Sequence, residues 1–255
     1  MKTLLKFVDT ETTGFDPSNG DRLIELGVVG VLSENDAYRK AFHRLWRFDP
    51  ARWMPAEAFA VHGLSTAYLS RYPRFADVAG EIAAEFGLSQ TPIGAAPHAI
   101  DEFFEEGIDW NGIEETVFIA HNASFDHRFI AREFELAGYG RPPNFRDSLD
   151  RARRLFPDGR QSLDALSKRF SVGLPRNVHG ALIDAAILSE IWKELDLEES
   201  RRRSFDLETD RGIAGRVDVA GILAPKKLRR FEPAPVDLER HEAGVAALPN
   251  AMWKS

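Results

Sequence analysis

The segment Thr-Leu-Leu-Lys-Phe-Val-Asp-Thr-Glu-Thr-Thr-Gly, residues 3–14, begins as an almost continuous apolar run and ends in acidic and small polar residues. Such a run is typical of a strand buried on both faces at the centre of a sheet. Asp9 and Glu11 lie two residues apart, so both carboxylates point to the same face of that strand. Buried like charges repel each other and lose hydration unless a cation compensates them. The segment therefore predicts a central strand ending at a cation site, unless capping of the turn at 12–14 satisfies one acid.

The pattern around this strand predicts an α/β fold. Two further strands are expected at 23–32 and 37–48, joined by a tight connection, so the chain opens with an antiparallel meander. A short apolar strand follows at 116–120, and helical spacing appears at 75–86, 125–136, 148–156, 162–170 and 180–195. Strands followed by alternating strands and helices indicate a mixed sheet flanked by helices. We expect one catalytic domain at 1–197 and a charged, proline-punctuated linker and tail at 198–255.

The composition excludes several classes of protein. The 255 residues are 44% hydrophobic and 29% charged, which excludes a wholly disordered, collagen-like or membrane-embedded chain. There is no cysteine, so disulfides, thiol nucleophiles and cysteine-bound zinc are excluded, and any metal must bind through oxygen or imidazole. The N-terminal apolar run stops at Asp9, short of a signal peptide, and no segment approaches the ~20 apolar residues of a membrane span. We therefore expect a cytoplasmic protein.

The charges are unevenly distributed along the chain. The net charge of −7 argues against binding nucleic acid by overall electrostatics. No Lys or Arg occurs between Arg74 and Arg128, whereas ten acids lie between Asp77 and Glu115. Residues 201–230 instead carry nine Lys and Arg against four acids. The acidic stretch is typical of a solvated face that repels phosphates, and the basic one is a candidate contact for polynucleotide or an acidic partner.

Two more acids occupy positions that suit the binding of a divalent cation. Asp184 falls on the apolar stripe of its expected helix, and Asp126 lies in the first turn of the helix after the strand at 116–120, where it could also serve the helix dipole. Acids at strand ends and helix starts suit Mg²⁺ or Mn²⁺. Two such ions about 4 Å apart would stabilise both the attacking and the leaving oxygens in phosphodiester hydrolysis. His179, expected in the loop before the helix of Asp184, has the chemistry of a general base for the attacking water.

Three motifs occur in order: Asp9-Thr-Glu-Thr-Thr-Gly14, His121-Asn-Ala-Ser-Phe-Asp126 and His179-Gly-Ala-Leu-Ile-Asp-Ala185. Together they resemble the motifs of the DEDDh family of 3′–5′ exonucleases. The resemblance spans residues 4–195 and is greatest to the proofreading subunits of bacterial replicative DNA polymerases, with support from the segments 57–63, 147–148, 152–153 and 162–166. It implies an RNase H-like fold with a mixed five-stranded sheet flanked by helices.

The resemblance also implies roles for individual residues. Asp9, Glu11, Asp126 and Asp184 would hold two Mg²⁺ or Mn²⁺ ions, and His179 would be the base. The terminal nucleotide would contact a separate set of residues, namely Thr12, Thr13, Gly14, Glu57, Phe59, Val61 and His62. The implied partners are DNA 3′ ends, a DNA polymerase catalytic subunit bound through the C-terminal tail, and a sliding clamp.

Two features depart from the family pattern. The acidic insertion at 87–115 is longer than the usual connection, and the tail has no glutamine-led clamp-binding peptide, for which residues 203–207 are a weak substitute. Residues 228–253 faintly resemble a polymerase-docking tail. The function expected is metal-dependent removal of nucleotides from single-stranded or frayed DNA 3′ ends. The alternatives are a free-standing DEDDh nuclease for RNA ends or oligonucleotides, and a structural polymerase subunit.

Overall fold

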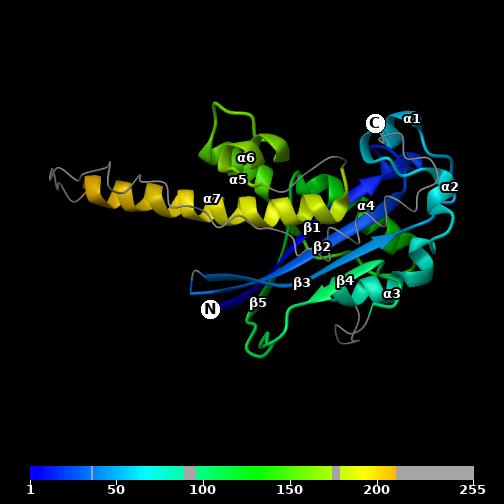
Figure 1. The fold of residues 1–255 in the computed structure, drawn as a ribbon, viewed down its shortest axis with the longest axis horizontal. Coiled ribbons are helices and arrows are strands. Elements are labelled where there is room, and N and C mark those ends of the chain that lie inside the picture. The colour runs from blue at the N-terminus through cyan, green and yellow to red at the C-terminus, as the bar shows by residue number, and fades with distance from the viewer. Residues whose placement is uncertain (36, 89–95, 174–178, 211–255) are drawn as a thin grey trace. The chain divides into compact units, whose positions relative to one another are not determined.

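A six-stranded sheet forms the centre of the protein (Figure 1). The computed structural model describes residues 1–35, 37–88, 96–173 and 179–210, with the backbone alone for 205–210. The strand order is β4-β3-β2-β1-β5-β6. The strands are β1 (Lys2–Thr12), β2 (Leu23–Glu34), β3 (Ala37–Arg47), β4 (Asp101–Phe104), β5 (Glu115–Ala120) and β6 (Phe145–Asp147).

The sheet is mixed, as the order of elements predicted. Neighbouring strands from β1 to β4 pair antiparallel, and β5 and β6 join the other edge of β1 in parallel. This topology confirms the opening meander and the predicted central position of the first strand. The carboxyl ends of β1, β5 and β6 consequently meet at one edge of the sheet, where α/β proteins form their sites.

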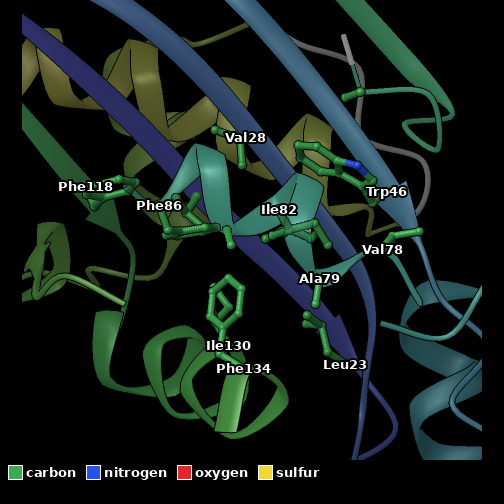
Figure 2. Packing of buried hydrophobic residues seen from close by; sticks show 14 of the residues in the cluster. Leu23, Val28, Trp46, Val78, Ala79, Ile82, Phe86, Phe118, Ile130 and Phe134 are labelled. Atoms are coloured by element: carbon green, nitrogen blue, oxygen red, sulfur yellow. The ribbon is translucent and has the colours of Figure 1, made fainter. Parts of the chain in front are cut away.

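Helices cover both faces of the sheet. They are α1 (Ala56–His62), α2 (Thr66–Leu69), α3 (Phe75–Glu85), α4 (Ala123–Leu136), α5 (Ser148–Leu155), α6 (Leu163–Phe170) and α7 (Ala181–Asp210), with a short 3₁₀ turn η1 at Pro17–Asn19. On one face α3 and α4 pack through Ile82, Phe86 and Phe134 against Val28 and Trp46, as Figure 2 shows. On the other face α5, α6 and α7 form a second cluster.

The alternation of β1 assigns its residues to these two layers. Leu4 and Val8 belong to the cluster of α3 and α4, whereas Leu5 and Phe7 belong to that of α7. Lys6 lies on the α3 face and is buried, yet its Nζ donates to Glu85 Oε2 at 2.8 Å. Burial, and then the charge of Arg44, lowers the pKa of Lys6 to about 7. A lysine can therefore interrupt the apolar run of a central strand because an acid from α3 meets it.

Two expectations differ from the structure. The sheet has six strands rather than five, because β4, which lies in the acidic insertion, pairs with β3. All four residues of β4 are exposed, so its sequence carries no alternation of apolar and polar residues that could reveal a strand. The last helix also continues to Asp210, past the start of the expected linker at 198. Residues 200–204 are exposed there, so no core burial marks this part of the helix in the sequence.

Within the described residues, none of the helices combines the length and apolar character needed to cross a membrane. The rest of the tail, from 211 to 255, lies outside the residues that the structure describes. The docking and clamp-binding predictions for the tail therefore remain predictions.

Candidate active site

The end of β1 presents its polar residues to two faces of the sheet. Because Phe7 packs toward α7, the same alternation directs Asp9 and Glu11 toward α7 and Thr10 toward α4. Glu11 and Thr10 are buried, and Asp9 is partly buried. The pairing with β2 shifts register between Glu11 and Thr12, at the point where the chain leaves the sheet. The first motif is therefore a strand end that offers carboxylates to one helix and a hydroxyl to the other.

The N-terminus of α7 approaches the sheet very closely. A β-carbon at Gly27 of β2 would lie 2.5 Å from the carbonyl oxygen of Ala181 and 2.5 Å from the amide nitrogen of Leu182. The amide of Ala181 donates to Glu25 Oε1 at 2.8 Å, and the other oxygen of Glu25 accepts from Arg47 Nε at 2.6 Å. Glu25 thus satisfies a free amide of the first helical turn. Together Gly27 and Glu25 fix the height of α7 above the sheet.

This contact brings Asp184 to the end of β1. Glu11, His179 and Asp184 each offer a ligand atom within 4.8 Å of the others. Both carboxylates are buried, whereas the side chain of His179 is 44% exposed and its Nδ1 lies 3.4 Å from Asp184 Oδ2. His179 lies in the loop before α7, as its position in the motif predicted. Buried carboxylate oxygens of this kind fit a hard divalent cation.

Asp126 reaches β1 from the opposite helix layer. Its Oδ1 accepts from Thr10 Oγ1 at 2.7 Å, and burial raises its pKa to about 7. The start of α4 is held by Asp147, whose carboxylate accepts from the amides of Asn122 and Ala123 at 3.1 Å each. Asp126 therefore contacts the end of β1 through Thr10, the residue that lies between Asp9 and Glu11 in the sequence. Neither Asp9 nor Asp126 belongs to the compact group of Glu11, His179 and Asp184, so their role as metal ligands stays a prediction.

The turn after β1 is held by hydrogen bonds from its own side chains. Thr12 Oγ1 donates to the Gly14 carbonyl at 2.6 Å. Thr13 is buried, and its hydroxyl bonds to Asp21 Oδ1 at 3.3 Å and accepts from the Arg22 amide at 3.0 Å. A β-carbon at Gly14 would meet the Asp21 carboxylate, with Oδ1 2.6 Å away. The Thr12 and Thr13 side chains thus stabilise the turn, and the backbone is what this turn can offer to a ligand.

The residues of α1 that were predicted to contact the terminal nucleotide differ in their exposure to solvent. Glu57, Phe59 and Val61 are exposed, the last two by 45% and 50%. His62 is buried, and its Nδ1 accepts from the Leu64 amide at 3.0 Å, so the ring carries its proton on Nε2. Nε2 is buried and has no hydrogen-bond partner among the described groups. Burial, and then the nearby charge of His179, lowers the pKa of His62 to about 4, which keeps the ring neutral.

Three residues that position the site were not singled out from the sequence. Thr10 holds Asp126, Glu25 holds the start of α7, and Gly27 allows its close approach. Glu25 carries a recognisable signal, since it is an acid within the apolar run Leu-Ile-Glu-Leu-Gly-Val-Val of residues 23–29. Gly27 has the weaker signal of a glycine inside a strand, which often marks the close approach of another backbone.

The three sequence motifs lie within the match to a known protein family. The model of the family described as "Exonuclease" matches residues 7–104 and 99–192, which include all three motifs. The chain belongs to this exonuclease family of nucleases and has its RNase H-like fold.

Among curated proteins, the chain is similar to epsilon subunits of DNA polymerase III. The chain is 30% identical over 256 residues to DNA polymerase III subunit epsilon of Rickettsia prowazekii, covering 98% of this chain and 92% of the relative. It is 34% identical over 195 residues to the subunit of the same name from Escherichia coli, covering 72% and 68% of the two chains.

Solved structures share the fold at low sequence identity. Product-bound exonuclease I aligns with a TM-score of 0.56 and 16% identity, over 79% of this chain and 45% of that one. A 3′-exonuclease that recognises a histone mRNA stem-loop aligns with a TM-score of 0.55 and 12% identity, over 76% and 63%. At these identities the similarity supports the fold and not the substrate.

Proposed function

We propose that the protein removes nucleotides from the 3′ ends of single-stranded or frayed DNA, as the proofreading subunit of a replicative DNA polymerase. The observation that carries this proposal is the group of Glu11, His179 and Asp184 at the end of β1, in a chain of the exonuclease family. The epsilon relatives support DNA as the substrate and polymerase as the partner, since one of them aligns with 98% of this chain.

Each acid has a place in the proposed centre. Glu11 and Asp184, together with Asp9 and Asp126, would hold two Mg²⁺ or Mn²⁺ ions. Bound there, such ions would stabilise the negative charge that develops on the attacking and leaving oxygens. Their positive charge would also favour the ionised form of Asp126, whose pKa is raised by burial.

His179 has the position of a general base. Its imidazole is partly exposed and can reach a water molecule, while Asp184 lies on the side of Nδ1 and would orient the ring. Burial favours the neutral form of His62, whose Nε2–H has no partner among the described groups and would donate to an oxygen of the terminal nucleotide. The exposed side chains of Phe59 and Val61 would contact the base and sugar of the same nucleotide.

Hydrolysis of labelled single-stranded DNA and RNA, measured side by side with Mg²⁺ and with EDTA, tests the enzymatic proposal. We expect rapid shortening of DNA with Mg²⁺, slower shortening of RNA, and none with EDTA. Faster hydrolysis of RNA would favour a free-standing RNA nuclease. No hydrolysis of either polymer would favour a structural subunit.

The proposed partner is tested with a shortened chain. The residues proposed to be catalytic all precede α7 or lie in its first turn, so removal of residues 211–255 spares them. Residues 211–255 contain four prolines and also Trp253, a residue type that often anchors interfaces. We expect the shortened chain to hydrolyse a short oligonucleotide within about threefold of the full chain and to lose co-purification with the polymerase. Retained binding to the polymerase would remove the tail from this role.

A further inference from the structure

Trp53 and Phe15 are the most exposed aromatic side chains in the described part of the chain, at 82% and 81%. Phe15 follows the turn after β1, and Trp53 lies between β3 and α1. A single exposed hydrophobic residue needs no special explanation. Three further observations indicate that the exposed Trp53 binds a ligand. They concern the backbone that carries Trp53, its connection to the turn that follows β1, and the charge of the surrounding residues.

The backbone that carries Trp53 is fixed and strained. Next to it Met54 is 5% exposed, and its amide donates to Thr66 Oγ1 at 2.9 Å. Two residues before Trp53, Ala51 has a φ of 52°, a conformation that is unfavourable for a residue with a β-carbon. The Asp49 carboxylate accepts from the Ala51 amide at 2.9 Å and holds this turn. The protein thus buries the smaller Met54 and presents the larger Trp53 to solvent from a strained turn, a feature that is common at functional sites.

The same segment is hydrogen-bonded to the turn that follows β1. Arg52 donates to the Gly20 carbonyl and, at 2.9 Å, to Asp21 Oδ1. Asp21 in turn accepts from Thr13 Oγ1 at 3.3 Å and lies against Gly14. Trp53 is therefore coupled to the turn that follows Glu11. Through the chain it also leads directly into α1, which carries the proposed contacts to the terminal nucleotide. Figure 1 shows α1 near the end of the sheet where β1 ends.

The charge of this region favours a phosphate backbone. Residues 47–74 contain four arginines and two acids, whereas no Lys or Arg occurs from 75 to 127. Arg47 and Arg52 pair with Glu25 and Asp21, so the exposed Arg71 and Arg74 supply the positive charge that a phosphate would meet. Arg71 lies over the ring of Tyr68, 5.2 Å from its centroid, and keeps its guanidinium on the same set of helices. A polyanion leaving the catalytic centre would be attracted toward α1 and α2 and repelled by the acidic segment.

We propose that Trp53 stacks on a base of the single-stranded substrate upstream of the terminal nucleotide. This inference rests on the proposed exonuclease function and adds a second binding position to it. Every base has a π-face, so stacking on Trp53 binds single strands of any sequence. A base held in a duplex has its faces covered by its neighbours, so this position also favours unpaired ends over paired ones.

Substrates of two lengths separate this position from the catalytic centre. The p-nitrophenyl ester of thymidine 5′-monophosphate offers only a terminal nucleotide, whereas the octamer (dT)₈ extends beyond it. For Trp53→Ala in the full chain, we expect the KM of (dT)₈ to rise about tenfold, within the range that loss of one base–aromatic stack produces. Its kcat and the kcat/KM of the ester should stay within about twofold. Trp53→Phe should restore most of the affinity, because it retains an aromatic face.

Leu136→Ala is the matched control, since Leu136 is 51% exposed at the end of α4 and should leave both substrates unchanged. An unchanged KM for (dT)₈ in Trp53→Ala would overturn the proposal. An equal loss of kcat/KM for the ester would also overturn the proposal, because Trp53 would then stabilise the turn that follows β1 instead of binding a second nucleotide. Binding of fluorescein-labelled (dT)₈ in EDTA, measured by anisotropy, is the second readout. It decides the role of Trp53 even if the wild-type chain hydrolyses neither substrate, a result that would reject the exonuclease proposal alone.

Discussion

Replacement of Gly27 by alanine tests whether the site depends on the close approach of α7 to β2. The added β-carbon would lie 2.5 Å from the Ala181 carbonyl oxygen and 2.5 Å from the Leu182 amide nitrogen. Both are backbone atoms in the first turn of the helix that carries Asp184, so no flexible side chain can yield. Ordinary van der Waals contact begins near 3.4 Å, and the start of α7 must therefore retreat by about 1 Å.

Two effects of different size follow from this retreat. Overpacking of a well-packed interior costs roughly 1–3 kcal/mol of stability, so the variant should remain folded. A misplacement of about 1 Å at a catalytic centre costs on the order of 100-fold in rate. The retreat also lengthens the 2.8 Å hydrogen bond from the Ala181 amide to Glu25, which weakens the anchor of the helix. We therefore expect Gly27→Ala to lose about 100-fold in kcat while it loses less than about 3 kcal/mol of stability.

Hydrolysis of a single-stranded oligonucleotide with Mg²⁺ and unfolding in urea are the two measurements. Gly140→Ala is the control, since a β-carbon there meets no atom within 4 Å. That variant should match the wild type in both. Activity of Gly27→Ala within about threefold of wild type would refute the view that the height of α7 sets the catalytic geometry.

Four further substitutions test individual side chains. Asp9→Ala and Asp184→Ala should each abolish hydrolysis yet leave the melting temperature in EDTA unchanged or higher, because Asp184 lies beside Glu11 and Asp9 shares a strand face with Glu11, so that these acids repel one another without cations; a variant that keeps most of its activity would show that the replaced acid is not a metal ligand. His179→Ala should lower turnover by roughly 10²–10⁴ with little change in Mn²⁺ affinity by calorimetry, and a collapse of affinity would make His179 a ligand. The pKa of His62 is about 4 in the folded protein against an ordinary 6.5, so the unfolded chain binds more protons between these values and stability falls as the pH drops through that window. Between pH 7 and pH 5 this effect should cost the wild type about 2 kcal/mol that His62→Gln does not lose, and equal pH profiles in urea unfolding would show that His62 is not held neutral.

The sequence predicted the central strand, the meander and the loop position of His179, because each has a local signal. The run ending at Asp9 is apolar on both faces, and Asp184 lies on an apolar helix stripe. These are the positions where burial and charge conflict, and such conflict is visible in a sequence without any structure.

The remaining features depend on contacts between distant segments. The strand β4 has no alternating pattern, and pairing with β3 alone makes it a strand. Glu25 reads as one acid in an apolar run until the start of α7 meets it from 156 residues away. Thr10 likewise has no expected role until Asp126 meets it across the sheet end. The grouping of Glu11, His179 and Asp184, without Asp9 and Asp126, follows from helix placement that no spacing rule determines.

The direction and metal dependence of hydrolysis decide whether the protein is a metal-dependent 3′–5′ exonuclease. A single-stranded DNA oligonucleotide with a 5′ label is incubated with the full chain in Mg²⁺, in EDTA, and with the Asp184→Ala variant in Mg²⁺. We expect a ladder that shortens one nucleotide at a time from the 3′ end with the wild type in Mg²⁺, and an intact oligonucleotide in the other two reactions. Release of the labelled 5′ nucleotide first, internal cuts, or equal hydrolysis in EDTA or by Asp184→Ala would contradict this expectation.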